Sequence, residues 1–123
     1  MSDVFLAPRD LNVVTVDGNY TPALTDAGKA LDVDGATDTV LITIPDNSAV
    51  PFPTGTVMEI ANLTDETVNI DGDTGVTVRS FDEDDLEGGS TAARTMAGRF
   101  AVAVVRKLDT DEWLLTGQLE GIA

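Results

Sequence analysis

Hydrophobic and polar residues alternate in short runs along most of the chain, and Pro, Gly, Asn and Asp separate the runs. A period of two is typical of β-strands, because successive side chains point to opposite faces of a sheet. The centre of the chain, residues 39–78, contains four such runs, which we expect to form an antiparallel meander. Two of them, Thr67–Ile70 and Gly75–Val78, flank an Asp-Gly turn and are predicted to pair as a hairpin.

Two of the predicted strands carry apolar residues on both faces. In residues 40–44, Leu41 lies opposite a face made of Val40, Ile42 and Ile44. In residues 99–107, one face holds Phe100, Val102 and Val104, and the other holds Ala101, Ala103 and Val105. Such strands are expected to be covered on both sides, by a second sheet or by a neighbouring subunit. A last strand, Glu112–Gly117, is predicted to pair back as a hairpin and to bring the single tryptophan, Trp113, into the core.

The N-terminal part of the chain has alternative interpretations. Residues 1–18 are either a first strand after a frayed terminus or an extended arm that docks on a partner, because apolar residues at an unanchored end need a cover. The apolar residues of this segment include Val4, Phe5, Leu6, Val13, Val14 and Val16. From Tyr20 to Val33 we expect a strand, a tight turn and a second short strand. A single helical turn over residues 25–29, capped by Thr25, is the alternative.

Residues 80–98 interrupt the β pattern for longer than a structureless connection usually does in a compact domain. Phe81 and Leu86 stand beside the acidic run Asp82–Asp85, so we expect part of this long acidic loop to pack. Together with it, residues 19–123 are predicted to form one domain. Regularly spaced short strands indicate an all-β fold, either an antiparallel β-sandwich or a small β-barrel.

Composition narrows the possible partners. A chain of 123 residues suits one domain with one core, and 42% hydrophobic but only 5% aromatic residues favour a core of Val, Leu, Ile and Ala. The net charge of −15 argues against nucleic acid and against an anionic membrane surface as partners.

The first ten residues lack the basic and apolar regions of a signal peptide, and no stretch has the length and apolarity of a membrane span.

Few residues are available for catalysis or metal binding. The absence of cysteine and histidine excludes zinc sites built from them, thiol chemistry and histidine-based triads. Asp71 and Asp73 resemble the start of a calcium loop, but Val76 and Asp82 replace the Gly and Glu that an EF-hand requires. A second acidic group, around Gly35, consists of Asp32, Asp34 and Asp38. We assign no metal site, no cofactor and no enzymatic activity.

The order of turns and strand ends carries a resemblance to a known group of proteins. The residues concerned are Tyr20, Leu24, Asp26–Lys29, Ile44–Pro45, Phe52–Thr56, Val68–Ile70, Gly75–Val78 and Trp113–Gly117. In this order they resemble a β-rich module of tailed-bacteriophage virion proteins, which include capsid decoration proteins, head fibres and terminal domains of tail appendages. The resemblance spans roughly Tyr20 to Leu119 and implies a homotrimeric β domain without enzymatic activity.

Within this group we expect a capsid decoration (cement) protein, because the chain begins with a short segment instead of a fibre shaft. It would be made in the host cytoplasm, bind the major capsid protein on the outer capsid surface of the virion as a homotrimer, and stabilise the shell. The six apolar residues of the N-terminal segment are the expected capsid-binding residues. The expected trimer interface consists of Leu41, Phe81, Leu86 and Val105. The alternatives are a tail or neck appendage that recognises a host receptor, and a carbohydrate-binding domain.

Overall fold

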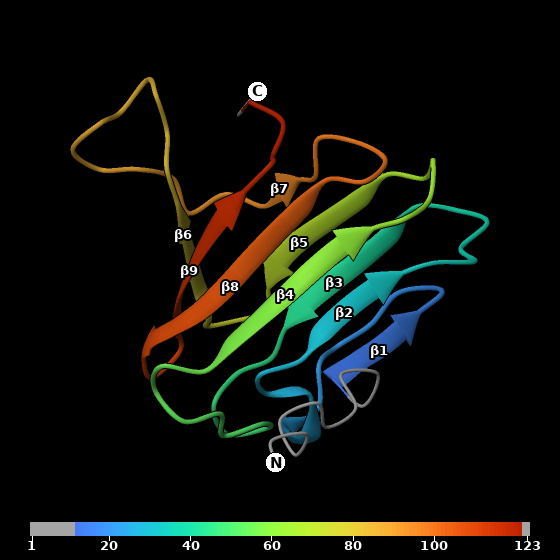
Figure 1. The fold of residues 1–123 in the computed structure, drawn as a ribbon. Coiled ribbons are helices and arrows are strands. Elements are labelled where there is room, and N and C mark those ends of the chain that lie inside the picture. The colour runs from blue at the N-terminus through green and yellow to red at the C-terminus, as the bar shows by residue number, and fades with distance from the viewer. Residues whose placement is uncertain (1–11, 122–123) are drawn as a thin grey trace, which may run out of the picture.

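In the computed structural model, which describes residues 12–121, the chain folds into two packed β-sheets (Figure 1). The strands are β1 (Val13–Val16), β2 (Ala30–Val33), β3 (Val40–Ile44), β4 (Val57–Asn62), β5 (Val68–Gly72), β6 (Thr77–Ser80), β7 (Arg94–Thr95), β8 (Val102–Asp109) and β9 (Glu112–Gly117). The larger sheet has the order β1-β2-β4-β8-β9-β6, and the smaller has the order β3-β5-β7. The prediction of an all-β sandwich is therefore confirmed, but both sheets mix parallel and antiparallel pairs and are not antiparallel throughout.

In the first half of the chain, successive segments belong alternately to the larger and the smaller sheet. In the larger sheet β1, β2 and β4 pair in parallel, and in the smaller sheet β3 pairs in parallel with β5. Tyr20 adds a parallel bridge to Ile42 at the outer side of β3. Successive segments thus alternate between the sheets. The predicted central meander is wrong, and so is the hairpin of Thr67–Ile70 with Gly75–Val78, because β5 and β6 lie in different sheets.

The second half of the chain adds β8, β9 and β6 to the larger sheet. β8 pairs with β4 on one side and with β9 on the other, and β6 lies parallel to β9 at the sheet edge. The predicted hairpin of the last two strands is confirmed. Its turn contains Asp111 with a φ of 54°, a left-handed conformation that Asp tolerates better than most residues.

No helix among residues 12–121 is long and apolar enough to cross a membrane.

The core lies between the sheets and is filled from alternate positions of the strands. Its fully buried large side chains include Leu31, Ile42, Ile44, Met58, Ile60, Ile70, Trp113 and Leu115. The rings of Phe52 and Trp113 meet edge to face, with centroids 5.6 Å apart, so the prediction that Trp113 is a core residue is confirmed. Phe100 differs from its prediction, because it precedes β8 and its side chain is 67% exposed.

The N-terminal part of the described chain forms a strand and a short helical turn. Residues 13–16 form β1, while residues 1–11 lie outside the described residues. Tyr20 forms an isolated bridge instead of the first of two predicted strands, and β2 is the second. Between them, the 3-10 helix η3 (Leu24–Asp26) begins one residue before the helical alternative, and the predicted tight turn follows it, closed by the Lys29 N–H donating to Asp26 O at 3.0 Å.

Candidate functional site

The residues expected at a trimer interface do not form one surface. Leu41 is partly exposed on the outer side of β3, whereas Phe81 and Leu86 lie beyond the end of β6. Val105 is fully buried on the inner face of β8, where Met58 and Leu115 flank it in register. The prediction that Val105 faces a partner is therefore wrong, because the second sheet of the same chain covers it.

The residues expected to bind a capsid are divided in a similar way. Val4, Phe5 and Leu6 lie outside the described residues. Within β1, Val13 is exposed, Val14 is half-buried against the core and Val16 is buried in it. The prediction that Val16 contacts a capsid is wrong, because this side chain belongs to the core of its own domain.

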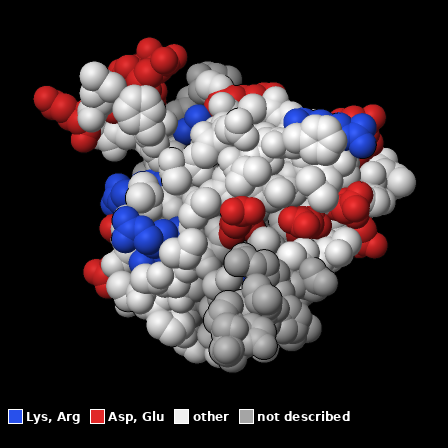
Figure 2. All heavy atoms as spheres, in the orientation of Figure 1, with Lys and Arg blue, Asp and Glu red and all other residues white. Residues whose placement is uncertain are grey.

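The segment predicted as a long acidic loop contains a protrusion with an ordered base. Ser80 and Ser90 form an antiparallel bridge, with N–H···O distances of 2.8 and 2.9 Å, and residues 81–89 project beyond it (Figures 1 and 2). We call residues 81–89 the acidic loop. The Oδ1 atoms of Asp82 and Asp85 accept backbone N–H groups within it, each at 2.9 Å. The loop is therefore held by its own hydrogen bonds and leaves Phe81 and Leu86 exposed.

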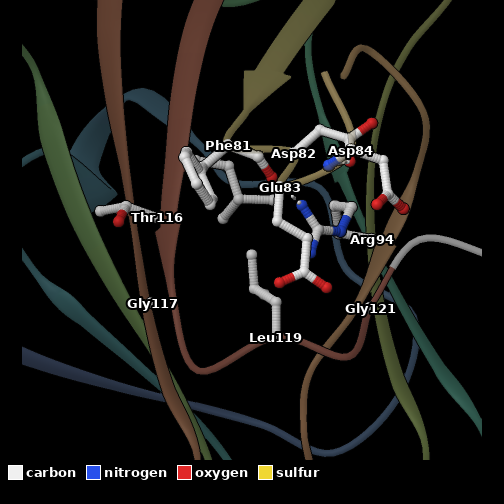
Figure 3. Close-up of a pocket in the computed structure, with 10 residues that line it drawn as sticks. Phe81, Asp82, Glu83, Asp84, Arg94, Thr116, Gly117, Leu119 and Gly121 are labelled. Atoms are coloured by element: carbon white, nitrogen blue, oxygen red, sulfur yellow. Dashed lines mark hydrogen bonds between the residues drawn. The ribbon is translucent and has the colours of Figure 1, made fainter. Parts of the chain in front are cut away.

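Arg94 lies buried at the base of this loop. It is 8% exposed and lines a pocket of about 480 Å³ between the acidic loop and the end of β9 (Figure 3). Its Nη1 donates to Ser80 Oγ at 2.8 Å and to Phe81 O at 3.1 Å, and its Nη2 donates to Glu120 O at 2.8 Å. Arg94 thus joins the end of β6, the acidic loop and the C-terminal segment through neutral oxygens.

The rest of the pocket brings together acidic and apolar groups. Asp82, Glu83 and Asp84 line it on the side of the loop, and Leu115 and Leu119 line the opposite side. Figure 3 shows the carboxylate of Glu83 on the same side of the loop as Arg94. The described lining residues include no nucleophile held against a base. The geometry therefore supports a structural joint at the foot of the loop.

Within the part of the chain that the structure describes, the acidic residues considered as metal ligands do not come together in one site. Within residues 12–121 no three acidic side chains come together in a way that holds a metal ion. Asp38, Asp71 and Asp73 each accept the backbone N–H of the next residue through Oδ1, at distances of 2.7, 2.8 and 2.8 Å. These carboxylates therefore stabilise their own turns.

A second buried cation lies at the opposite end of the sandwich. Lys107 is 3% exposed, and its Nζ donates to Asn47 Oδ1 at 2.5 Å and to Phe52 O at 2.7 Å. The backbone N–H of Asn47 donates to Asp111 Oδ1 at 2.6 Å. This network ties the loop between β3 and β4 to the β8–β9 hairpin, and it satisfies every buried polar atom of Lys107.

Tyr20 and Asp26 form a further polar contact, at the edge of the smaller sheet. The Tyr20 hydroxyl donates to Asp26 Oδ2, which also accepts the backbone N–H of Ala23 at 2.9 Å. Burial, together with the hydrogen bond and charge of Asp26, raises the pKa of Tyr20 to about 12. The contact holds η3 against the chain beside β3.

The single tyrosine of the chain makes this contact testable by absorbance. We expect Tyr20 to titrate near pH 12 in the folded protein, against an ordinary value of 10.0. Because the pKa is higher in the folded state, the stabilising contribution is complete below pH 10 and is lost as the pH rises through 12. In Asp26→Asn the pKa should fall part of the way back. Titration of folded wild-type protein at its ordinary value would contradict the contact.

Phe100 combines unusual exposure with an unusual backbone. Its φ is 68°, a left-handed conformation that is rare for a bulky side chain, and its N–H donates to Asn62 O at 2.6 Å. The Arg99 guanidinium lies 5.2 Å from the centre of the exposed ring. Phe100 is thus a large apolar side chain held outside the core. Compared with known proteins, the chain matches no protein-family model and no curated protein.

Proposed function

We propose that this protein is a structural virion protein that decorates a phage capsid, binding the outer shell as a trimer and bracing neighbouring capsomers. The observation that supports the proposal most directly is the exposure of Phe81, Leu86 and Phe100, at 70%, 75% and 67%. Phe81 and Leu86 belong to one projecting loop, and large apolar side chains grouped on a surface are typical of sites that bind other proteins. The resemblance from Tyr20 to Leu119 supplies the class of partner.

Adhesion to the shell is assigned to the N-terminal segment and the strand that follows it. Among residues 12–121, β1 pairs with β2 alone, so its other edge presents backbone groups to which a further strand can bind. Val4, Phe5 and Leu6 precede this edge in the sequence and supply apolar side chains. Backbone pairing at β1 and apolar contacts from these three residues together form the proposed capsid-binding element.

A truncation tests this element without damage to the core. Deletion of residues 2–11 leaves β1 and the buried Val16 in place, whereas a cut that included residue 16 would open the core. We expect the shortened chain to keep its unfolding midpoint and to lose at least about tenfold in affinity for undecorated shells, the equivalent of about 1.4 kcal/mol. A matched full-length variant replaces Val4, Phe5 and Leu6 with serine. Unchanged affinity in both proteins would overturn the role of the segment.

A receptor-binding appendage of the tail or neck is the alternative function. The projection of the acidic loop away from the sandwich body favours it, because exposed loops on a rigid scaffold often carry recognition residues (Figure 2). Purified protein is incubated with host cells and, separately, with undecorated shells. Binding to shells supports the decoration protein, and binding to cells alone supports the appendage.

The strained conformation of Phe100 predicts a conflict between stability and binding. Glycine adopts a φ of 68° without steric cost, so we expect Phe100→Gly to raise the free energy of unfolding by about 1 kcal/mol while weakening partner binding. Urea denaturation measures the first effect and shell binding the second. Phe81→Gly is the matched control, because Phe81 is equally exposed but has no positive φ. A less stable Phe100→Gly would contradict the assignment of strain.

A further inference from the structure

A row of four residues crosses the outer face of the larger sheet. Val57, Arg106, Leu114 and Arg79 are in register on β4, β8, β9 and β6. Their strand neighbours Met58, Val105, Trp113 and Val78 are buried, so the four side chains of the row point outward. Adjacent strands are about 4.8 Å apart, which places the two arginine backbones about 10 Å apart with Leu114 between them. We call these four residues the basic row.

The basic row is exceptional on this protein. The chain has 7 Lys and Arg residues against 22 Asp and Glu residues, and Arg94 and Lys107 are buried. Arg79 pairs with Glu112 at 3.5 Å, while Arg106 makes no ion pair with any residue from 12 to 121. Figure 2, which views this sheet from outside, shows one group of basic side chains at the left margin of the face and another at the upper right. An apolar residue between two cations on a strongly acidic protein fits an acidic partner.

The acidic loop has the complementary pattern. It carries Asp82, Glu83, Asp84, Asp85 and Glu87, and among these acids stand the two apolar residues Phe81 and Leu86. Both apolar side chains are at least 70% exposed in the single chain. The bridge between Ser80 and Ser90 holds the base of the loop at the end of β6, the strand that also carries Arg79. The acidic loop and the Arg79 end of the basic row therefore lie at the same edge of the larger sheet.

We propose that the acidic loop of one copy docks on the basic row of a second copy. Leu86 packs on Leu114 and Val57, and the carboxylates of the loop face Arg106 and Arg79. Because loop and row are different surfaces, the contact is head to tail, and its repetition gives a ring of copies when the rotation from one copy to the next closes. Opposite charges fix the register of the contact and disfavour other pairings between strongly anionic chains. The inference rests on the self-assembly in the proposed function and identifies its interface.

Charge reversal tests the contact in the full-length protein. The row-reversed variant is Arg79→Glu with Arg106→Glu. The loop-reversed variant is Glu83→Lys, Asp84→Lys and Glu87→Lys, three acids whose side chains make no hydrogen bond within residues 12–121. We expect each variant to fall from the oligomer mass to the mass of one chain in sedimentation equilibrium, and the variant that combines both reversals to regain the oligomer mass.

Controls separate this interface from folding and from shell binding. Arg99→Glu reverses an exposed arginine away from the row and should leave the mass unchanged, and far-ultraviolet circular dichroism checks that every variant is folded. A monomeric wild type, or oligomers that persist in both reversed variants, overturns the proposed contact. If the reversals act as expected but wild-type protein does not bind shells, the contact stands and capsid decoration is overturned.

Discussion

Replacing Trp113 with alanine is expected to lower the free energy of unfolding by about 3–5 kcal/mol. The side chain is 1% exposed, lies between the sheets and meets the Phe52 ring edge to face. Its removal loses the transfer free energy of the largest core residue and leaves a cavity that two hydrogen-bonded sheets close only partly. Urea denaturation followed by circular dichroism measures the change, because the variant has no tryptophan fluorescence.

The neighbouring residue on β9 is a matched control for Trp113. Leu114 points to the outer face and is only half-buried, so Leu114→Ala is expected to cost less than about 1 kcal/mol. It also removes the apolar centre of the basic row, and so should weaken self-association more than it weakens the fold. Similar unfolding losses in the two variants would show that the two faces of β9 are equally buried, contrary to the structure.

Periodicity in the sequence was sufficient to predict the fold class and most strands. Val40, Ile42 and Ile44 alternate with more polar neighbours, and all three are fully buried. For β8 the pattern placed the residues on the correct faces but did not identify the inner one. Ala103 and Val105 point into the core, although the opposite face of the run has the larger apolar residues. The reason is that pairing with β4 and β9 fixes which face of β8 points toward the second sheet.

The topology of the centre could not be predicted from local turn chemistry. Asp71–Thr74 has the composition of a hairpin turn, but a chain that passes from one sheet to the other needs the same turn residues. Here the chain folds back so tightly that a Cβ on Gly72 would lie 2.7 Å from Val76 O. Parallel pairing of β3 with β5 depends on contacts across a long sequence separation, which a pattern of alternating residues does not encode.

The exposure of the acidic loop differs from its prediction. Phe81 and Leu86 were expected to pack because they stand beside an acidic run, but both side chains are exposed. The basic row was not predictable, because Arg79, Arg106 and Leu114 come together only through the register of three strands. The burial of Arg94 could not be predicted either, because the oxygens that accept its hydrogen bonds belong to Ser80, Phe81 and Glu120, which are not its neighbours in the sequence.

Replacing Arg94 with methionine is expected to lower the free energy of unfolding by about 2–4 kcal/mol, because Ser80 Oγ, Phe81 O and Glu120 O lose their common donor. Methionine keeps much of the buried stem, so the loss reports on the hydrogen bonds more than on packing. The variant should also loosen the base of the acidic loop. Urea denaturation measures the first effect, and faster hydrogen exchange at the amides of Ser80 and Ser90 measures the second.

Arg99→Met is the matched control for Arg94, since it removes an exposed arginine and is expected to change stability by less than about 0.5 kcal/mol. Equal effects of the two substitutions would contradict the role of Arg94 as a joint. If Arg94→Met loosens the loop, it should also reduce the oligomer mass while every charge of loop and row remains in place. Such a result would separate two requirements of the proposed contact, because complementary charges attract the loop and Arg94 holds it in the position from which it reaches a second copy.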